Sequence, residues 1–128
     1  MRREILNWLE QAEHDLGTAE YLYDGQRYGA ATFSCQQAVE KALKALYIHK
    51  LSSSPGQTHS LIHLAKETKT PREFFELLQN LTPEFVTTRY PDVVGDVPYK
   101  LYGEKKTSDY VKGSRELIKW IKDRIPRP

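Results

Sequence analysis

Residues 28–51 read YGAATFSCQQAVEKALKALYIHKL, a run with no proline and with no glycine after Gly29. Ala, Leu, Lys, Glu and Gln dominate it, and these residues are strong helix formers. At about 100° per residue, the small and apolar residues gather on one side of a helix. They are Ala31, Cys35, Ala38, Val39, Ala42, Leu43, Ala45 and Leu46. The pattern predicts a helix that buries this side, and its alanines predict the close approach of a neighbouring helix.

The opposite side of this helix carries a polar stripe, formed by Gln36, Gln37, Glu40, Lys41 and Lys44. We expect an amphipathic helix to bury its apolar side and to present this stripe. One interpretation is a solvated face, with Glu40 and Lys44 as an i,i+4 ion pair. The alternative is a face that binds a partner or a nucleotide, because a glutamine amide donates and accepts hydrogen bonds at once.

The chain has 128 residues, and we expect a single domain over 1–128. Its one cysteine, Cys35, excludes an internal disulfide and favours a reducing, cytoplasmic setting. No apolar run approaches the roughly 18 residues of a membrane span, so we expect no membrane association. A net charge of +2 and a pI near 8.6 are only mildly basic, which by themselves do not indicate nucleic-acid binding.

Other segments also have helical periodicity. Residues 1–23 form an amphipathic pattern that ends at Asp24-Gly25, where Gly25 suits a left-handed helix end. Further helices are predicted over 60–67 with Thr58 as cap, from Thr70-Pro71, for one turn from Thr82, and from Thr107 or Ser108 to about 125. Residues 87–107 have no period and form a long irregular loop. No strand is evident, so the sequence predicts an all-α, up-and-down antiparallel bundle of four to five helices.

Four motifs occur in a fixed order. They are Ala12-Glu13-x-Asp15-Leu16, the run from Ala31 to Leu46 that contains Gln36-Gln37-Ala38-Val39-Glu40-Lys41, Thr58-His59-Ser60-Leu61, and Thr88-Arg89-Tyr90-Pro91-Asp92. Together they resemble the HEPN domain, a small bacterial and archaeal helical domain named for nucleotide binding. The resemblance covers nearly the whole chain.

The resemblance implies a bundle that associates into homodimers or higher homo-oligomers. It also implies a frequent partner, a minimal nucleotidyltransferase, in a toxin–antitoxin-like pair. Members with an arginine followed after four to six residues by a histidine are metal-independent ribonucleases. No arginine of this chain has a histidine at that distance, so ribonuclease activity is not carried over by that motif. The chain instead resembles the Arg-Tyr-Pro-Asp subgroup.

Within that run, Arg89 offers a planar fork of donors suited to phosphate or carboxylate. Tyr90 offers a ring on which a base can stack, and Asp92 can orient Arg89 or hold a ribose hydroxyl. The structural alternative is an Arg89–Asp92 pair that pins the long loop, with Tyr90 and Pro91 packed beneath. Tyr102 in the same loop is a further candidate, because tyrosines favour half-exposed sites and interfaces.

His59 and His63 have the i,i+4 spacing of two zinc ligands, but no third ligand is evident, so we expect no metal and no cofactor. We expect His59 to make a hydrogen bond near its helix start. Cys35 lies on the apolar side of its helix and is expected to be an unreactive core thiol.

Three functions follow from these residues and from what the resemblance implies. The first is a binding module that docks a nucleotidyltransferase and contacts a nucleotide or RNA through Arg89, Tyr90 and the polar stripe. The second is a divergent metal-independent ribonuclease, for instance one that uses Arg89 with His59. The third is a dimerisation domain without a ligand. Because the ribonuclease motif is absent, we expect a binding module rather than an enzyme.

Overall fold

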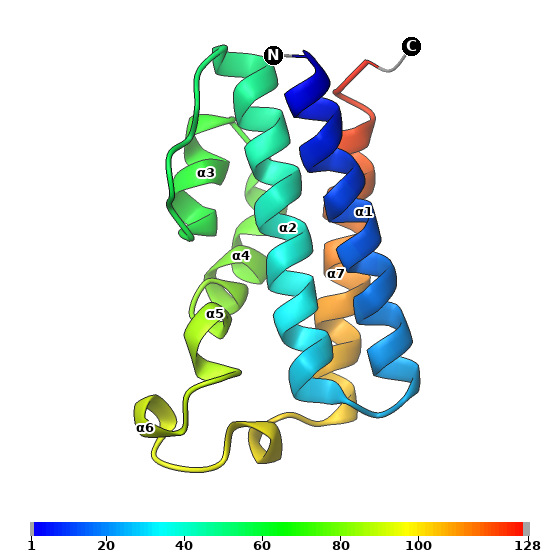
Figure 1. The fold of residues 1–128 in the computed structure, drawn as a ribbon, viewed down its shortest axis with the longest axis vertical. Helices are drawn as coiled ribbons and strands as arrows, with labels where there is room; N and C mark the ends of the chain where they lie inside the picture. Colours follow the sequence, from blue (N-terminus) through cyan, green and yellow to red (C-terminus); the bar gives the residue numbers. More distant parts are fainter. Residues whose placement is uncertain (1, 127–128) are drawn as a thin grey trace.

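The computed structural model describes residues 2–126, and within them every regular element is a helix. Three long helices run side by side along the molecule: α1 (Arg2–Asp24), α2 (Tyr28–Leu51) and α7 (Glu104–Lys122) (Figure 1). The shorter segments between α2 and α7 are α3 (Leu61–Glu67), η1 (Arg72–Phe74), α4 (Phe75–Leu81), α5 (Glu84–Thr87), α6 (Pro91–Val94) and η2 (Pro98–Leu101). The all-α prediction is confirmed.

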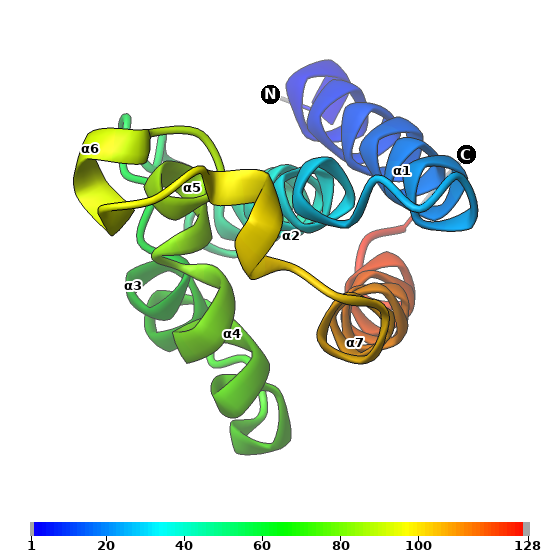
Figure 2. The same ribbon diagram turned by 90° about the horizontal axis from the view of Figure 1, so that it is seen from below.

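The helix α2 lies at the centre of the molecule. Figure 2 shows α1 and α7 on one side of it and α3, α4 and α5 on the other. Its alanines at 31, 38, 42 and 45 are fully buried, as are Ala12 and Ala19 of α1. These small side chains allow α1 and α2 to pack along their length, as the sequence predicted. Leucines and isoleucines from α3, α4 and α7 complete the same core.

The reversal between α1 and α2 uses a different residue from the one expected. Gln26, with a φ of 63°, is left-handed, whereas Gly25 still donates a helical hydrogen bond to Tyr21. The amide of Arg27 donates to the carbonyl of Leu22, and that of Gln26 donates to Tyr23. This pair of bonds is the Schellman helix end, displaced by one residue. The prediction for Gly25 was therefore wrong.

Helix starts differ from the sequence prediction in three places. Ser60, not Thr58, caps α3, because its side chain accepts from the amide of His63. Pro71 is extended and is followed by η1 before α4 begins. The last helix, α7, begins at Glu104, so Thr107 lies inside it, where it is buried with its hydroxyl 3.5 Å from that of Thr32. A residue packed in this way is not available as a cap.

The irregular segment predicted over 87–107 contains α6, η2 and the first turn of α7. It leaves the lower end of the bundle, turns through α6 and returns through η2 (Figure 1). None of the helices in residues 2–126 combines the length and the apolar character that crossing a membrane requires.

Candidate functional site

The polar stripe of α2 surrounds a buried carboxylate, that of Glu40, which is 4% exposed. Oxygen Oε1 of Glu40 accepts from Gln36 Nε2 at 2.9 Å, and Oε2 accepts from Lys44 Nζ at 3.1 Å. Gln37 in turn donates to the amide oxygen of Gln36 at 2.8 Å. Gln36 and Lys44 are also buried, so the expectation that the stripe is presented outward was wrong for Gln36, Glu40 and Lys44.

The stripe is buried because other elements cover it from both edges. On one edge, Trp8 of α1 lies with its ring centroid 5.5 Å from Lys44 Nζ, and Asp15 of α1 pairs with Lys41 at 2.5 Å. On the other edge, the chain that leads into α3 brings His59 over Glu40. A helical wheel identifies the polar side of α2 but does not say what packs on it.

His59 connects this buried network to the surface. Its Nδ1 lies 2.9 Å from Glu40 Oε1, while its side chain is 48% exposed. The imidazole ring stacks on Phe85 of α5, with centroids 3.8 Å apart and planes 18° apart. The expected hydrogen bond near the start of α3 is therefore made to a carboxylate. A carboxylate that accepts from Nδ1–H leaves Nε2 free to accept a proton.

Arg89 lies beside the same phenylalanine ring. Its Nε donates to the carbonyl of Phe85 at 2.8 Å, and its guanidinium carbon is 4.4 Å from the centroid of that ring. The rings of Phe33 and Tyr90 are 4.7 and 4.9 Å away. Aromatic faces attract a cation without neutralising its charge. No carboxylate within residues 2–126 pairs with Arg89, so the guanidinium remains able to bind an anion.

The alternative of an Arg89–Asp92 pair was therefore wrong. The side chain of Arg89 turns back along α5 toward Phe85, whereas Asp92 is exposed on α6 and has no ion pair with another described residue. Tyr90 is 44% exposed, and its ring forms a cation–π contact with the guanidinium of Arg89. We call the surface formed by Phe33, Glu40, His59, Phe85, Arg89 and Tyr90 the His59–Arg89 face.

Tyr102 belongs to a second cluster, centred on the buried carboxylate of Glu84. The hydroxyl of Tyr102 donates to Glu84 Oε1 at 2.7 Å, and that of Tyr110 donates to Oε2 at 3.2 Å. Thr87 also donates to Oε1, and Lys106 Nζ lies 3.6 Å from Oε2. Burial and the adjacent carboxylate raise the pKa of both tyrosines well above the usual value of 10. We call these five residues the Glu84 cluster.

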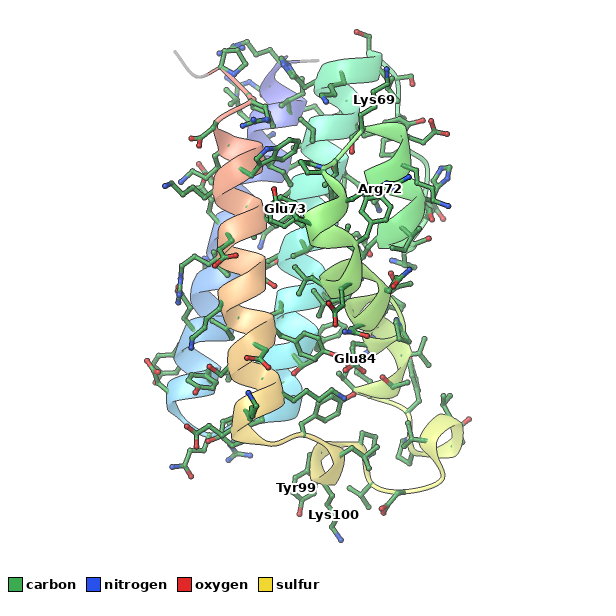
Figure 3. The ribbon with its side chains drawn as sticks, turned by 180° about the vertical axis from the view of Figure 1, so that it is seen from behind. Lys69, Arg72, Glu73, Glu84, Tyr99 and Lys100 are labelled. Carbon is green, nitrogen blue, oxygen red and sulfur yellow. The ribbon has the colours of Figure 1, made fainter. Side chains whose placement is uncertain are left out.

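The Glu84 cluster joins α5, the residue that follows η2 and the first half of α7, and Figure 3 labels Glu84 among them. It forms one wall of a pocket of about 540 Å³. No local pattern pointed to this cluster, apart from the start of a helical turn after Pro83. All four partners of Glu84 are hydroxyls or an ammonium, so each can donate a hydrogen bond to the buried carboxylate.

Two further expectations concern reactive side chains. Cys35 is fully buried, and burial raises the pKa of its thiol to about 12, so it is the core thiol that the sequence predicted. Among residues 2–126, no three His, Cys, Asp or Glu side chains lie close enough together to hold a metal ion. His63, the other member of the spaced pair, is exposed on α3.

The chain is similar in sequence and in fold to several known proteins. The chain is 28% identical over 134 residues to MJ1304 of Methanocaldococcus jannaschii, described as a candidate toxin, with 91% of this chain and 84% of that protein covered. The crystal structure of ST0689, an archaeal HEPN homologue, matches with a TM-score of 0.82 and 31% identity. That of TT1696 from Thermus thermophilus matches with a TM-score of 0.85 and 26% identity. Each covers 96% of this chain and 98% of the other.

The family assignment does not depend on these pairwise matches alone. The model of the HEPN domain matches residues 5–124, which include nearly all of the three long helices and both clusters described above. The motifs over 31–46 and 88–92 that resembled this family lie on α2 and at the junction of α5 and α6. The chain belongs to the HEPN domain family.

Proposed function

We propose that this chain is the HEPN component of a toxin–antitoxin-like pair and that it binds RNA or a nucleotide at the His59–Arg89 face. The observation that carries the proposal is the guanidinium of Arg89. Three aromatic rings hold it, no described carboxylate neutralises it, and His59 lies against one of those rings. A planar cation beside aromatic rings, of which Tyr90 is exposed, suits a phosphate with an adjoining base. The candidate toxin from Methanocaldococcus jannaschii supports the toxin–antitoxin setting.

The test is binding of a fluorescent single-stranded RNA, measured by anisotropy for the wild type and for Arg89→Ala. Loss of one charged hydrogen-bonding contact costs about 1.5 kcal/mol or more, so we expect at least roughly tenfold weaker binding. The melting temperature should change little, because Arg89 is exposed. Equal losses in binding and stability would indicate that Arg89 only pins the segment after α5.

The chain offers a matched control in Arg124. Its Nη1 donates to the carbonyl four residues earlier, that of Trp120, and its guanidinium lies 4.1 Å from the indole centroid. Arg124→Ala therefore removes an arginine with the same local arrangement at the opposite end of the molecule. RNA binding should stay within about twofold of the wild type. Similar losses of RNA affinity in Arg89→Ala and Arg124→Ala would show that RNA binding depends only on the overall charge of the protein.

A second candidate function is metal-independent RNA cleavage, which the Glu40–His59 contact favours. In this reaction, Nε2 of His59 takes the proton of a ribose 2′-hydroxyl, and the oxygen attacks the adjacent phosphorus. The 5′-oxygen leaves with a proton from water, and Arg89 stabilises the charge on the phosphoryl oxygens. Incubation of RNA in EDTA should then give 2′,3′-cyclic phosphate ends with the wild type and none with His59→Ala. Intact RNA with the wild type would exclude this candidate.

The proposed partner is a minimal nucleotidyltransferase, and the proposed assembly is a homodimer. Co-expression with the neighbouring gene product, followed by co-purification and light scattering, tests both. A stable dimer that binds neither RNA nor a nucleotidyltransferase would leave dimerisation without a ligand as the function.

A further inference from the structure

A hollow lined only by cationic, apolar and hydroxyl side chains lies where α3 gives way to η1 and α4. It measures about 590 Å³, and its lining residues are Ala65, Lys66, Lys69, Thr70, Arg72 and Phe75. We call it the basic hollow. Figure 3 shows Lys69 and Arg72 on the side of α3, whereas Glu73 lies on the opposite side of η1, toward α7. The charged groups that line the hollow are therefore all positive.

These three cations have no partner within the described part of the chain. Lys66, Lys69 and Arg72 are exposed, and none forms an ion pair or a side-chain hydrogen bond with another residue of 2–126. Other cations of this protein do find partners, since Lys44 pairs with Glu40 and Arg115 pairs with Glu20. Like charges gathered in one concavity repel each other, and a bound anion removes that repulsion.

The turn that carries Lys69 is fixed rather than loose. Lys50 at the end of α2 donates to the carbonyl of Thr68 at 2.6 Å, and the hydroxyls of Thr68 and Thr70 lie 2.9 Å apart. Both threonines are buried. Lys69 between them has a φ of 57°, in the left-handed region, and its side chain is exposed. A fixed turn loses little conformational entropy when a ligand binds.

The basic hollow and the His59–Arg89 face lie at opposite ends of one short helix. His59 precedes the N-cap of α3, and Lys66 is in its last turn. His63 and Lys66 are three residues apart on α3, the spacing of neighbours on one helix face, and both are exposed, as is His59. The seven residues of α3 span about 10 Å.

We propose that the basic hollow binds the phosphate backbone of a single-stranded RNA whose reactive or recognised nucleotide occupies the His59–Arg89 face. The inference rests on the proposed function and specifies its ligand, because one mononucleotide cannot reach both places. Lys66, Lys69 and Arg72 contact phosphates, and the half-buried ring of Phe75 forms the apolar wall. These contacts add affinity without sequence preference.

The salt dependence of RNA binding tests this assignment directly. Each phosphate contact with a single strand contributes about −0.7 to the slope of log K against log salt concentration. We expect Lys66→Ala/Lys69→Ala to make the slope shallower by about 1.4 for an RNA of about ten nucleotides. The control is Lys112→Ala/Lys119→Ala on α7, which removes the same charge from exposed lysines outside the hollow. Its slope should match that of the wild type.

A dinucleotide provides the second arm, because it is too short to span α3. Its affinity should be the same for the wild type and for the hollow variant. If dinucleotide or inorganic phosphate binding also falls in that variant, the hollow is a small-anion site and the backbone assignment is wrong. Wild-type binding of the long RNA with equal slopes in both lysine variants overturns the inference but leaves the proposed function standing. Failure of the wild type to bind RNA overturns both.

Discussion

Removal of one hydroxyl group from the Glu84 cluster tests whether this network holds the segment after α5 to the bundle. In Tyr102→Phe the ring stays, and only the group that donates to Glu84 Oε1 at 2.7 Å is lost. Tyr102 is 8% exposed and Glu84 is 4% exposed, so water does not readily replace that donor.

The magnitude follows from the partners that remain. A hydrogen bond to a charged group contributes about 1.5–3 kcal/mol. Glu84 keeps Tyr110, Thr87 and Lys106, so the carboxylate is not left alone, and we expect a loss of about 2 kcal/mol. For 128 residues, an unfolding entropy of about 2.1 cal/mol/K per residue gives about 0.27 kcal/mol/K. The melting temperature should therefore fall by about 7 °C.

The assay is urea and thermal unfolding of Tyr102→Phe beside Tyr99→Phe. Tyr99 is 69% exposed, points away from the bundle on η2 (Figure 3) and makes no hydrogen bond through its hydroxyl to another described residue. The same chemical change there should cost less than about 0.5 kcal/mol. A difference below about 0.5 kcal/mol between the two variants, at equal urea m-values, would refute the clamping role of the cluster.

Three further outcomes follow from the structure. Gly17→Ala should stabilise the protein by about 1 kcal/mol in urea melts, because a methyl group there meets nothing within 4 Å. Gly29→Ala should not stabilise it, because the added Cβ would lie 3.3 Å from the ring of Tyr102. The free energy of unfolding should fall as pH rises above about 9. Burial raises the pKa of Cys35 from 9.0 to about 12, so the unfolded chain loses this proton at a lower pH than the folded chain does. Urea melts between about pH 8 and 11 measure the decline. Cys35 should react with a thiol reagent at the rate of unfolding, which labelling with and without urea determines.

Local signals accounted for the long elements of the fold. The limits predicted for the central helix, 28–51, are those of α2, because its composition and the flanking Gly25 and Ser52 to Gly56 are features of the sequence itself. The family motifs are likewise short runs of neighbouring residues, and they led to the HEPN assignment that the family model confirms. Arg89, Tyr90 and His59 were candidates by side-chain chemistry, and the structure brings them together around Phe85.

The remaining features depend on contacts between distant residues. Glu84 receives two of its three hydroxyl donors from positions 18 and 26 residues later, and no spacing rule connects them. The sequence did not predict that Phe85 lies between His59 and Arg89, because both contacts depend on how distant segments pack. Within 91–102, likewise, Tyr102 reaches Glu84 and η2 packs against α2, and no periodicity predicts either contact.

The buried polar stripe of α2 links the fold to the proposed site. The side chains of Glu40 and Lys44 are both 6% exposed. Removing two charges from water costs free energy that their attraction does not fully repay, so two well-packed apolar residues would stabilise the fold at least as much. Such a pair is therefore weak evidence for stability. Its geometry has another consequence: Lys44 and Gln36 fix the carboxylate of Glu40, and that carboxylate fixes Nδ1 of His59 at the surface. An apolar stripe would pack at least as well but would leave Nδ1 of His59 without its carboxylate partner, so the polar residues of the central helix are better explained by the position of that imidazole than by the stability of the bundle.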